Sequence, residues 1–88
     1  MEAAFFLVSG QVQGVGFRAS ARHQALALAL SGYAHNRPDG KVEVFVQGAA
    51  PAIESFAQWI GRGSPLAKVE SVLRQRAQPR EMGGFGVG

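Results

Sequence analysis

The segment SGQVQGVGFRAS, residues 9–20, places glycines and an arginine where a strand is expected to turn into a helix. Gly14 and Gly16 permit positive φ angles, so the N–H groups of such a turn can converge on one anion. Arg18 falls in the first turn of the expected helix, where the helix dipole disfavours a cation by about 0.3–1 kcal/mol. A bound phosphate would offset that cost, because a guanidinium presents a planar pair of donors to phosphate oxygens. The spacing alone leaves two interpretations open: a phosphate cradle, or a tight turn whose arginine points to solvent.

Two widespread phosphate-binding motifs match this segment poorly. The P-loop ends in Gly-Lys followed by Ser or Thr, and no such sequence follows the glycines. Residues 14–19, GVGFRA, satisfy the looser dinucleotide fingerprint G-x-G-x-x-A, which also needs a carboxylate at the end of the next strand. Asp39 lies instead in a Pro-Asp-Gly turn, and the chain is too short for a doubly wound sheet. Neither motif therefore explains the glycines.

Hydrophobic periodicity predicts short strands and two helices around this segment. The Pro-Asp-Gly turn separates two extended segments, the second with alternating valines, and so predicts an antiparallel hairpin. The expected order is a strand at 3–8, a helix at 17–30 stopped by Ser31-Gly32, strands at 33–37 and 42–47, a helix from about Pro51 to Ile60, a strand at 67–77 and a possible short fifth strand in the tail.

This order at this length predicts an α+β fold, the ferredoxin-like βαββαβ two-layer sandwich. An antiparallel sheet of four strands, with a possible short fifth, would carry both helices on one face, as right-handed crossovers favour. A chain of 88 residues supports one modest core, so we expect a single domain over residues 1–88.

The composition is that of a folded globular protein and excludes several kinds of site. Hydrophobic residues make up 47% of the chain, and there is no cysteine for a disulfide, a thiolate metal site or a catalytic thiol. The N-terminal apolar run lacks a basic flank, and no segment approaches the ~20 apolar residues of a membrane span. We therefore expect a cytoplasmic protein without membrane contact. The net charge of +3 favours an anionic partner, while Arg74, Arg76 and Arg80 are interpreted as a solvated strand face.

Two blocks of the sequence resemble the signatures of the acylphosphatases. Residues 10–18, GQVQGVGFR, resemble the family's loop G-x-V-Q-G-V-x-[FY]-R. Residues 32–44, GYAHNRPDGKVEV, are similar to its second signature, G-[WFY]-V-x-N-x-x-D-G-x-V-E. The resemblance extends through the bend at 61–67 to an aromatic residue near the C-terminus. Residues 85–88 lack the arginine or tyrosine often found there, which leaves the packing of a fifth strand open.

The resemblance implies hydrolysis of the carboxyl–phosphate anhydride of a small-molecule acyl phosphate by direct attack of water. In the family, loop amides and an arginine hold the phosphate, an asparagine orients the water, and no metal, cofactor or covalent intermediate takes part. By motif position, the catalytic residues are Arg18 and Asn36. The phosphate-binding residues are Gln13, Gly14, Val15, Gly16, Phe17 and Arg18.

Hydrolysis of an acyl phosphate needs few catalytic groups, which agrees with a site made of loop amides, one arginine and one asparagine. The leaving carboxylate is a weak base that needs no general acid, so phosphoryl transfer demands mainly positioning and charge stabilisation. Amides and one arginine supply the charge, and a neutral side-chain amide can aim water in line. We expect inorganic phosphate as product and inhibitor, a monomer, and no nucleic-acid partner.

Two alternatives stand beside this expectation. Ferredoxin-like sheets also carry RNA-recognition domains, but the third strand offers only Phe45 as a stacking aromatic. A regulatory relative could keep the phosphate cradle without the reaction, although Arg18 and Asn36 are both present.

Overall fold

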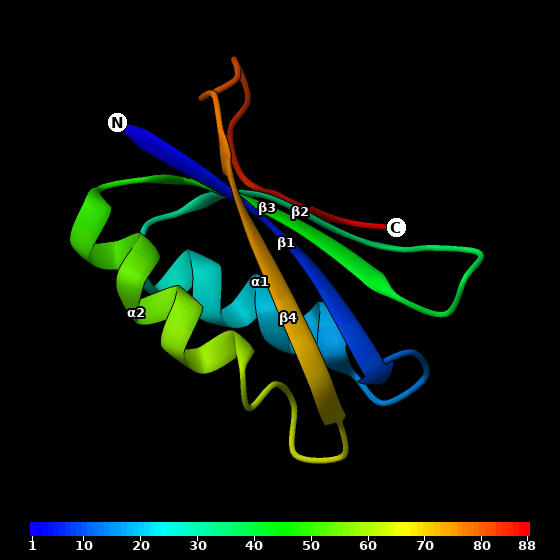
Figure 1. Cartoon of the computed structure of the whole chain (residues 1–88). Helices are drawn as coiled ribbons and strands as arrows, with labels where there is room; N and C mark the ends of the chain where they lie inside the picture. The colour runs from blue at the N-terminus through cyan, green and yellow to red at the C-terminus, as the bar shows by residue number, and fades with distance from the viewer.

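Two helices cover one face of a five-stranded sheet, and the opposite face carries no helix (Figure 1). The computed structural model describes residues 1–88. The expected ferredoxin-like α+β fold is confirmed. In chain order the elements are β1 (Glu2–Gln11), α1 (Phe17–Ala27), β2 (Ser31–Asn36), β3 (Val42–Gly48), α2 (Ala50–Ile60), β4 (Lys68–Ala77) and β5 (Phe85–Val87).

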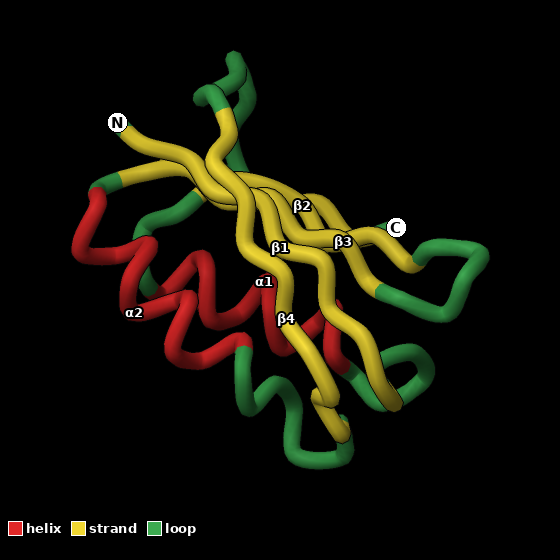
Figure 2. Tube along the Cα trace, viewed as in Figure 1, coloured by secondary structure: helices red, strands yellow, loops and turns green.

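The strands lie in the order β4-β1-β3-β2-β5 across the sheet, so β3 is central. β1 pairs antiparallel with β3 and β4, and β2 pairs antiparallel with β3. The expected antiparallel sheet of four strands is confirmed, and the short fifth strand, β5, pairs parallel with β2 and makes the whole sheet mixed. The reason is directional: β4 runs antiparallel to β2, so one chain reversal in residues 78–84 sets β5 parallel to it. Figure 2 shows this reversal as the loop that follows β4 at the top of the view.

The core fills the space between the helices and the sheet. Side chains alternate along β1 and β3, so the paired residues Phe6 and Val44 both point toward the helices. From α2, the predicted apolar stripe places Phe56 against Phe6, with ring centroids 6.0 Å apart. Burying one such large apolar side chain contributes about 1.5–3 kcal/mol. The buried stripe of α2 consists of Ile53, Phe56 and Ile60, and the buried side of α1 consists of Phe17, Ala21 and Ala25.

The two helices begin close to their predicted starts, but α1 ends earlier than expected. Ala29 adopts a left-handed φ of 58°, so the chain leaves the helix after Ala27 and not at Leu30. Leu30 turns into the core, and residues 31–32, expected to stop the helix, are the first residues of β2. Neither helix combines the length and apolar character that crossing a lipid bilayer requires.

Candidate active site

The glycine-rich turn between β1 and α1 is an open ring of backbone N–H groups. Gly14 and Gly16 have φ angles of 74° and 76°, the left-handed region in which N–H groups of successive residues turn to the same side. None of the N–H groups of residues 13–17 donates a hydrogen bond to another atom of the chain. These N–H groups are therefore free to bind a ligand. With the two positive φ angles, they make this turn a candidate anion cradle.

Side-chain hydrogen bonds of Ser64 and Gln13 tie the cradle to two other parts of the chain. Ser64, which is buried, donates from Oγ to the Val15 carbonyl oxygen at 2.8 Å and so turns that carbonyl outward. The Gln13 side-chain amide donates to the carbonyl oxygens of Arg37 and Lys41 at 2.8 and 3.0 Å, which ties the turn to the β2–β3 hairpin. Sequence reasoning missed Ser64, because a single serine in a bend carries no pattern that links it to a distant loop.

The Phe17 side chain packs beneath the turn. It is buried, and its ring lies 5.6 Å from the Trp59 ring of α2, centroid to centroid. A Cβ added to Gly63 would come within 2.8 Å of the Phe17 ring, so the bend after α2 also packs closely on it. The turn therefore rests on a rigid apolar base.

Arg18, the second residue of α1, reaches from the cradle to the end of β5. Its Nη1 donates to the Gly88 carbonyl oxygen at 2.6 Å. One helical turn later, Arg22 Nε donates to the Phe85 carbonyl oxygen at 3.2 Å. Two arginines on one side of α1 therefore fasten this helix to β5. The Arg18 side chain also lines the hollow at the cradle, together with the loop glycines.

Asn36 is the last residue of β2 and meets Arg18 at a shared acceptor. The Asn36 backbone N–H donates to the Gly88 carbonyl oxygen at 3.0 Å, the same oxygen that accepts from Arg18. Side chains alternate along a strand, so Asn36 shares the helix-facing side of β2 with the buried Ala34. Asn36 itself is exposed. Sequence reasoning did not predict the part of Gly88, because a backbone carbonyl leaves no side-chain signal.

The hairpin turn after Asn36 is shaped by Asp39. The Lys41 backbone N–H donates to Asp39 Oδ1 at 3.0 Å, and Arg37 Nε lies 3.2 Å from Oδ2. These contacts, the Lys41 hydrogen bond first, lower the pKa of Asp39. Because the folded-state pKa is lowered, the turn's contribution to stability is present at neutral pH and is lost as the pH falls through that pKa. Asp39 therefore stabilises the hairpin turn, as its place in the Pro-Asp-Gly sequence indicated.

The hollow at the cradle measures about 180 Å³ and combines polar with apolar walls. The loop glycines and Arg18 form its polar part, and Ala19 and the half-exposed Val87 form an apolar flank. Asn36 lies beside this hollow and is not part of its lining.

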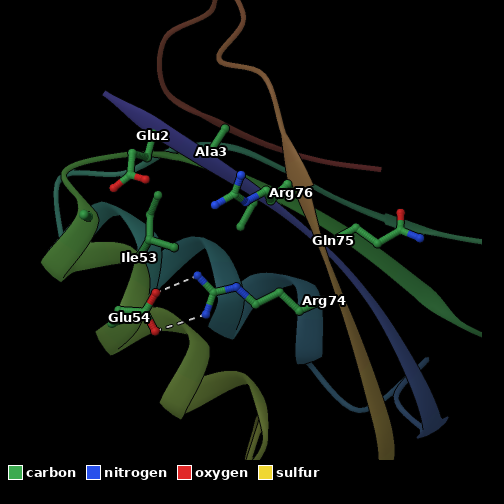
Figure 3. Close-up of a pocket in the computed structure, with 9 residues that line it drawn as sticks. Glu2, Ala3, Ile53, Glu54, Arg74, Gln75 and Arg76 are labelled. Atoms are coloured by element: carbon green, nitrogen blue, oxygen red, sulfur yellow. Dashed lines mark hydrogen bonds and ion pairs between the residues drawn. The ribbon is translucent and has the colours of Figure 1, made fainter.

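A larger hollow of about 360 Å³ lies elsewhere, between α2 and the ends of β1 and β4 (Figure 3). There Arg74 points at Glu54 and donates to both carboxylate oxygens at 3.0 and 2.6 Å. The Arg74 hydrogen bond, more than its charge, lowers the pKa of Glu54. Arg74 is an exposed residue of β4, as expected of a solvated strand face, and it pairs there with Glu54 of α2. This larger hollow contains no turn with convergent N–H groups, so we place the active site at the smaller one.

Replacing Gly16 by alanine tests whether the cradle depends on its backbone conformation. An added Cβ would meet no atom within 4 Å, so the change acts through φ alone. Holding a residue with a Cβ in the left-handed region costs about 1–2 kcal/mol. We expect Gly16→Ala to lower stability by about 1 kcal/mol and to weaken phosphate binding several-fold, as measured by calorimetric titration.

Gly40→Ala is the matched control for this change. Gly40 also has a positive φ, 87°, and open space around the added Cβ, but it lies in the hairpin turn. We expect a similar loss of stability with unchanged phosphate affinity. Equal losses of phosphate affinity in the two variants would contradict a specific role of the Gly16 conformation.

The fold and the turn together define a class of protein, a ferredoxin-like two-layer domain with an anion cradle at the start of its first helix. The family model for acylphosphatases matches residues 4–87, almost the whole chain. The chain therefore belongs to the acylphosphatase family, hydrolases that act on small-molecule acyl phosphates. The resemblance of the two signature blocks is thereby confirmed.

Individual relatives cover nearly the same length. The acylphosphatase of Xanthomonas campestris pv. campestris (strain 8004) is 54% identical over 74 residues, 84% of each chain. That of Thermus thermophilus is 49% identical over 81 residues, 92% of each chain. The crystal structure of acylphosphatase from Bacillus subtilis superposes with a TM-score of 0.95 at 34% identity, covering 100% of this chain and 99% of that one.

Proposed function

We propose that this enzyme cleaves acyl phosphates by direct in-line attack of water on phosphorus, within a single domain formed by residues 1–88. The bond from phosphorus to the acyl oxygen breaks, the electron pair leaves with the carboxylate, and water becomes part of inorganic phosphate. The observation that carries the proposal is that the N–H groups of residues 13–17 have no partner in the chain, in a turn whose glycines line one hollow with Arg18. Such an array stabilises charge on the equatorial oxygens of the transferring phosphoryl group.

Each proposed site residue has a distinct task. The amides of Gln13, Gly14, Val15, Gly16 and Phe17 bind phosphate oxygens, and Arg18 supplies the permanent positive charge that completes the cradle. The Asn36 side-chain amide accepts a hydrogen bond from the attacking water and holds it in line with the leaving oxygen. The shared contact of Arg18 and Asn36 with Gly88 supports this pairing of roles.

The open face of the sheet disfavours the RNA-binding alternative. Phe45, the only stacking aromatic of its strand, is fully buried, and the Arg80 guanidinium lies over its ring at 4.5 Å. A base therefore has no free aromatic surface to stack on at this position. The proposal is accordingly a monomeric cytoplasmic enzyme without a nucleic-acid partner. Size-exclusion chromatography and cell fractionation test its assembly and its location.

Steady-state kinetics with benzoyl phosphate test the proposed binding mode of the product. We expect inorganic phosphate to inhibit competitively, because product and substrate phosphoryl groups occupy the same cradle. EDTA is expected to leave the rate unchanged, since the proposed reaction uses no metal. Chloride at matched ionic strength is the control, because it separates binding at the site from salt screening. Inhibition by phosphate that excess substrate does not relieve would contradict the proposal.

A further inference from the structure

The connection from β4 to β5 crosses the sheet and depends on one buried side chain. β4 and β5 form opposite edges of the sheet, about four strand spacings of 4.8 Å apart, so residues 78–84 must pass over the intervening strands. Gln47 of β3 is only 2% exposed. Its Oε1 accepts from the Arg80 N–H at 2.6 Å, and its Nε2 donates to the carbonyl oxygens of Arg80 and Met82 at 2.8 and 3.3 Å.

No other hydrogen bond holds the backbone of residues 78–83. The Gln47 amide thus replaces the ladder of a neighbouring strand for this segment, with both donor and acceptor used. Its burial makes these bonds consequential, because a buried amide without partners is destabilising. Gln47 therefore fixes the path of the crossing segment at the centre of the sheet.

The Arg80 side chain holds the same segment against the sheet from above. Its guanidinium lies 4.5 Å from the Phe45 ring centroid and 5.6 Å from that of Tyr33. Such cation–π contacts contribute attraction on a partly desolvated surface. Arg80 is exposed, as expected, but it lies beyond the end of β4 and packs on aromatic side chains, so its expected place on a strand is wrong.

The crossing segment leads directly into the strand that contacts the active site. The Gly32 N–H donates to the Gly84 carbonyl oxygen at 3.0 Å, which marks the entry into β5. At the other end of β5, the Gly88 carbonyl oxygen accepts from Arg18 Nη1 and from the Asn36 N–H. β5 is only three residues long and parallel to β2, so it has little pairing of its own to fix its position.

From this chain of contacts we infer that Gln47 is a positioning residue for catalysis. By fixing residues 78–84 it sets the place of β5, and through Gly88 it sets the mutual position of the Arg18 guanidinium and of Asn36. Gln47 touches neither the cradle nor the reacting atoms. The inference rests on the proposed roles of Arg18 and Asn36.

The test compares Gln47→Leu, which keeps the size of the side chain and removes its hydrogen bonds, with Gln47→Glu, which keeps the acceptor for Arg80. We expect Gln47→Leu to lower kcat/KM for benzoyl phosphate by roughly 10- to 100-fold, because displacement of catalytic groups by about 1 Å has effects of this size. Its Kd for inorganic phosphate should rise about tenfold. Gln47→Glu should recover neither loss, because one carboxylate oxygen would face the carbonyl oxygens of Arg80 and Met82, to which Gln47 Nε2 now donates. Amide hydrogen exchange should accelerate at Asn36 and Gly88 and remain slow between β1 and β3.

Ile53→Val is the control for a general loss of stability. Ile53 is buried in α2, on the other side of the sheet from the crossing segment, and it lines the distant hollow. A lower Tm with unchanged phosphate affinity is expected. Should Gln47→Leu not fold, Gln47→Met makes the same test, because its unbranched thioether side chain has no N–H donor and only a weak acceptor.

The outcomes separate this inference from the proposed function. Wild-type phosphate affinity and kcat/KM in Gln47→Leu, or in Gln47→Met where that variant replaces it, overturn the inference if Arg18→Ala is impaired. If Arg18→Ala and Asn36→Ala are as active as the wild type, the proposed function itself has failed. Equal losses of phosphate affinity in Gln47→Leu and Ile53→Val assign Gln47 a purely structural part and also overturn the inference.

Discussion

Replacing Arg18 by alanine is expected to reduce kcat/KM for benzoyl phosphate by about 10³-fold or more and to weaken phosphate binding strongly. Removing one preorganised donor to developing charge typically has effects of 10²–10³-fold, and a phosphate-stabilising arginine reaches about 10³–10⁵-fold. Arg18 is the only proposed cradle group with a full positive charge. Steady-state kinetics give kcat and KM, and a calorimetric titration with inorganic phosphate gives the Kd.

Arg22→Ala is the matched control for this prediction. Both arginines lie on α1 and donate to carbonyl oxygens of the last strand region, Arg18 to Gly88 and Arg22 to Phe85. Only Arg18 lines the hollow at the cradle. We expect Arg22→Ala to lose less than about tenfold in kcat/KM, since Arg22 does not line the hollow and one hydrogen bond contributes about 0.5–1.5 kcal/mol to stability. Similar losses in the two variants would mean that Arg18 acts mainly as an anchor for β5.

Replacing Asn36 by alanine is expected to lower kcat by about 10²-fold with little change in the Kd for phosphate. The Asn36 side-chain amide is proposed to orient the attacking water, so its loss should slow the reaction. The phosphate is held by the cradle, so its Kd should change little. Misplacing a reacting group by about 1 Å is sufficient for a loss of this size. Rates at saturating benzoyl phosphate and a phosphate titration separate the two quantities.

The backbone contact of Asn36 makes this substitution a specific test. Its N–H donates to Gly88, and any residue except proline preserves that bond and the pairing of β2 with β5. A loss of activity therefore reports on the side-chain amide alone. If the variant loses phosphate affinity in proportion to kcat, then Asn36 binds the phosphoryl group and does not direct water.

Much of the fold could be predicted because local patterns and tertiary packing agree. The apolar stripe of α2 and the alternation of β3 each indicate one face toward a core, and that core exists. The end of α1 could not be placed, because Ala29 adopts a left-handed conformation that its residue type does not indicate. The direction of β5 depends on where residues 78–84 cross the sheet, which no periodicity in that segment reveals.

The residues proposed for the site were found from sequence, but their supports were not. Gly14, Gly16 and Arg18 stand together in one short motif whose spacing matters for chemistry. Ser64, by contrast, acts through one hydrogen bond to a residue 49 positions away in the sequence. Gln47 binds a segment that lies 33 residues away. Isolated polar residues at such separations show no pattern along the chain.

What the sequence determined by itself is therefore the turn of glycines before Arg18, the hairpin that carries Asn36, and the order of strands and helices. Each follows from neighbouring residues, through allowed φ angles, turn chemistry or side-chain periodicity. Only the tertiary structure decided that Gly88 joins Arg18 to Asn36 and that β5 runs parallel to β2. The physical reason is that these contacts are made by backbone groups, which every residue carries, so their partners are chosen by the path of the whole chain.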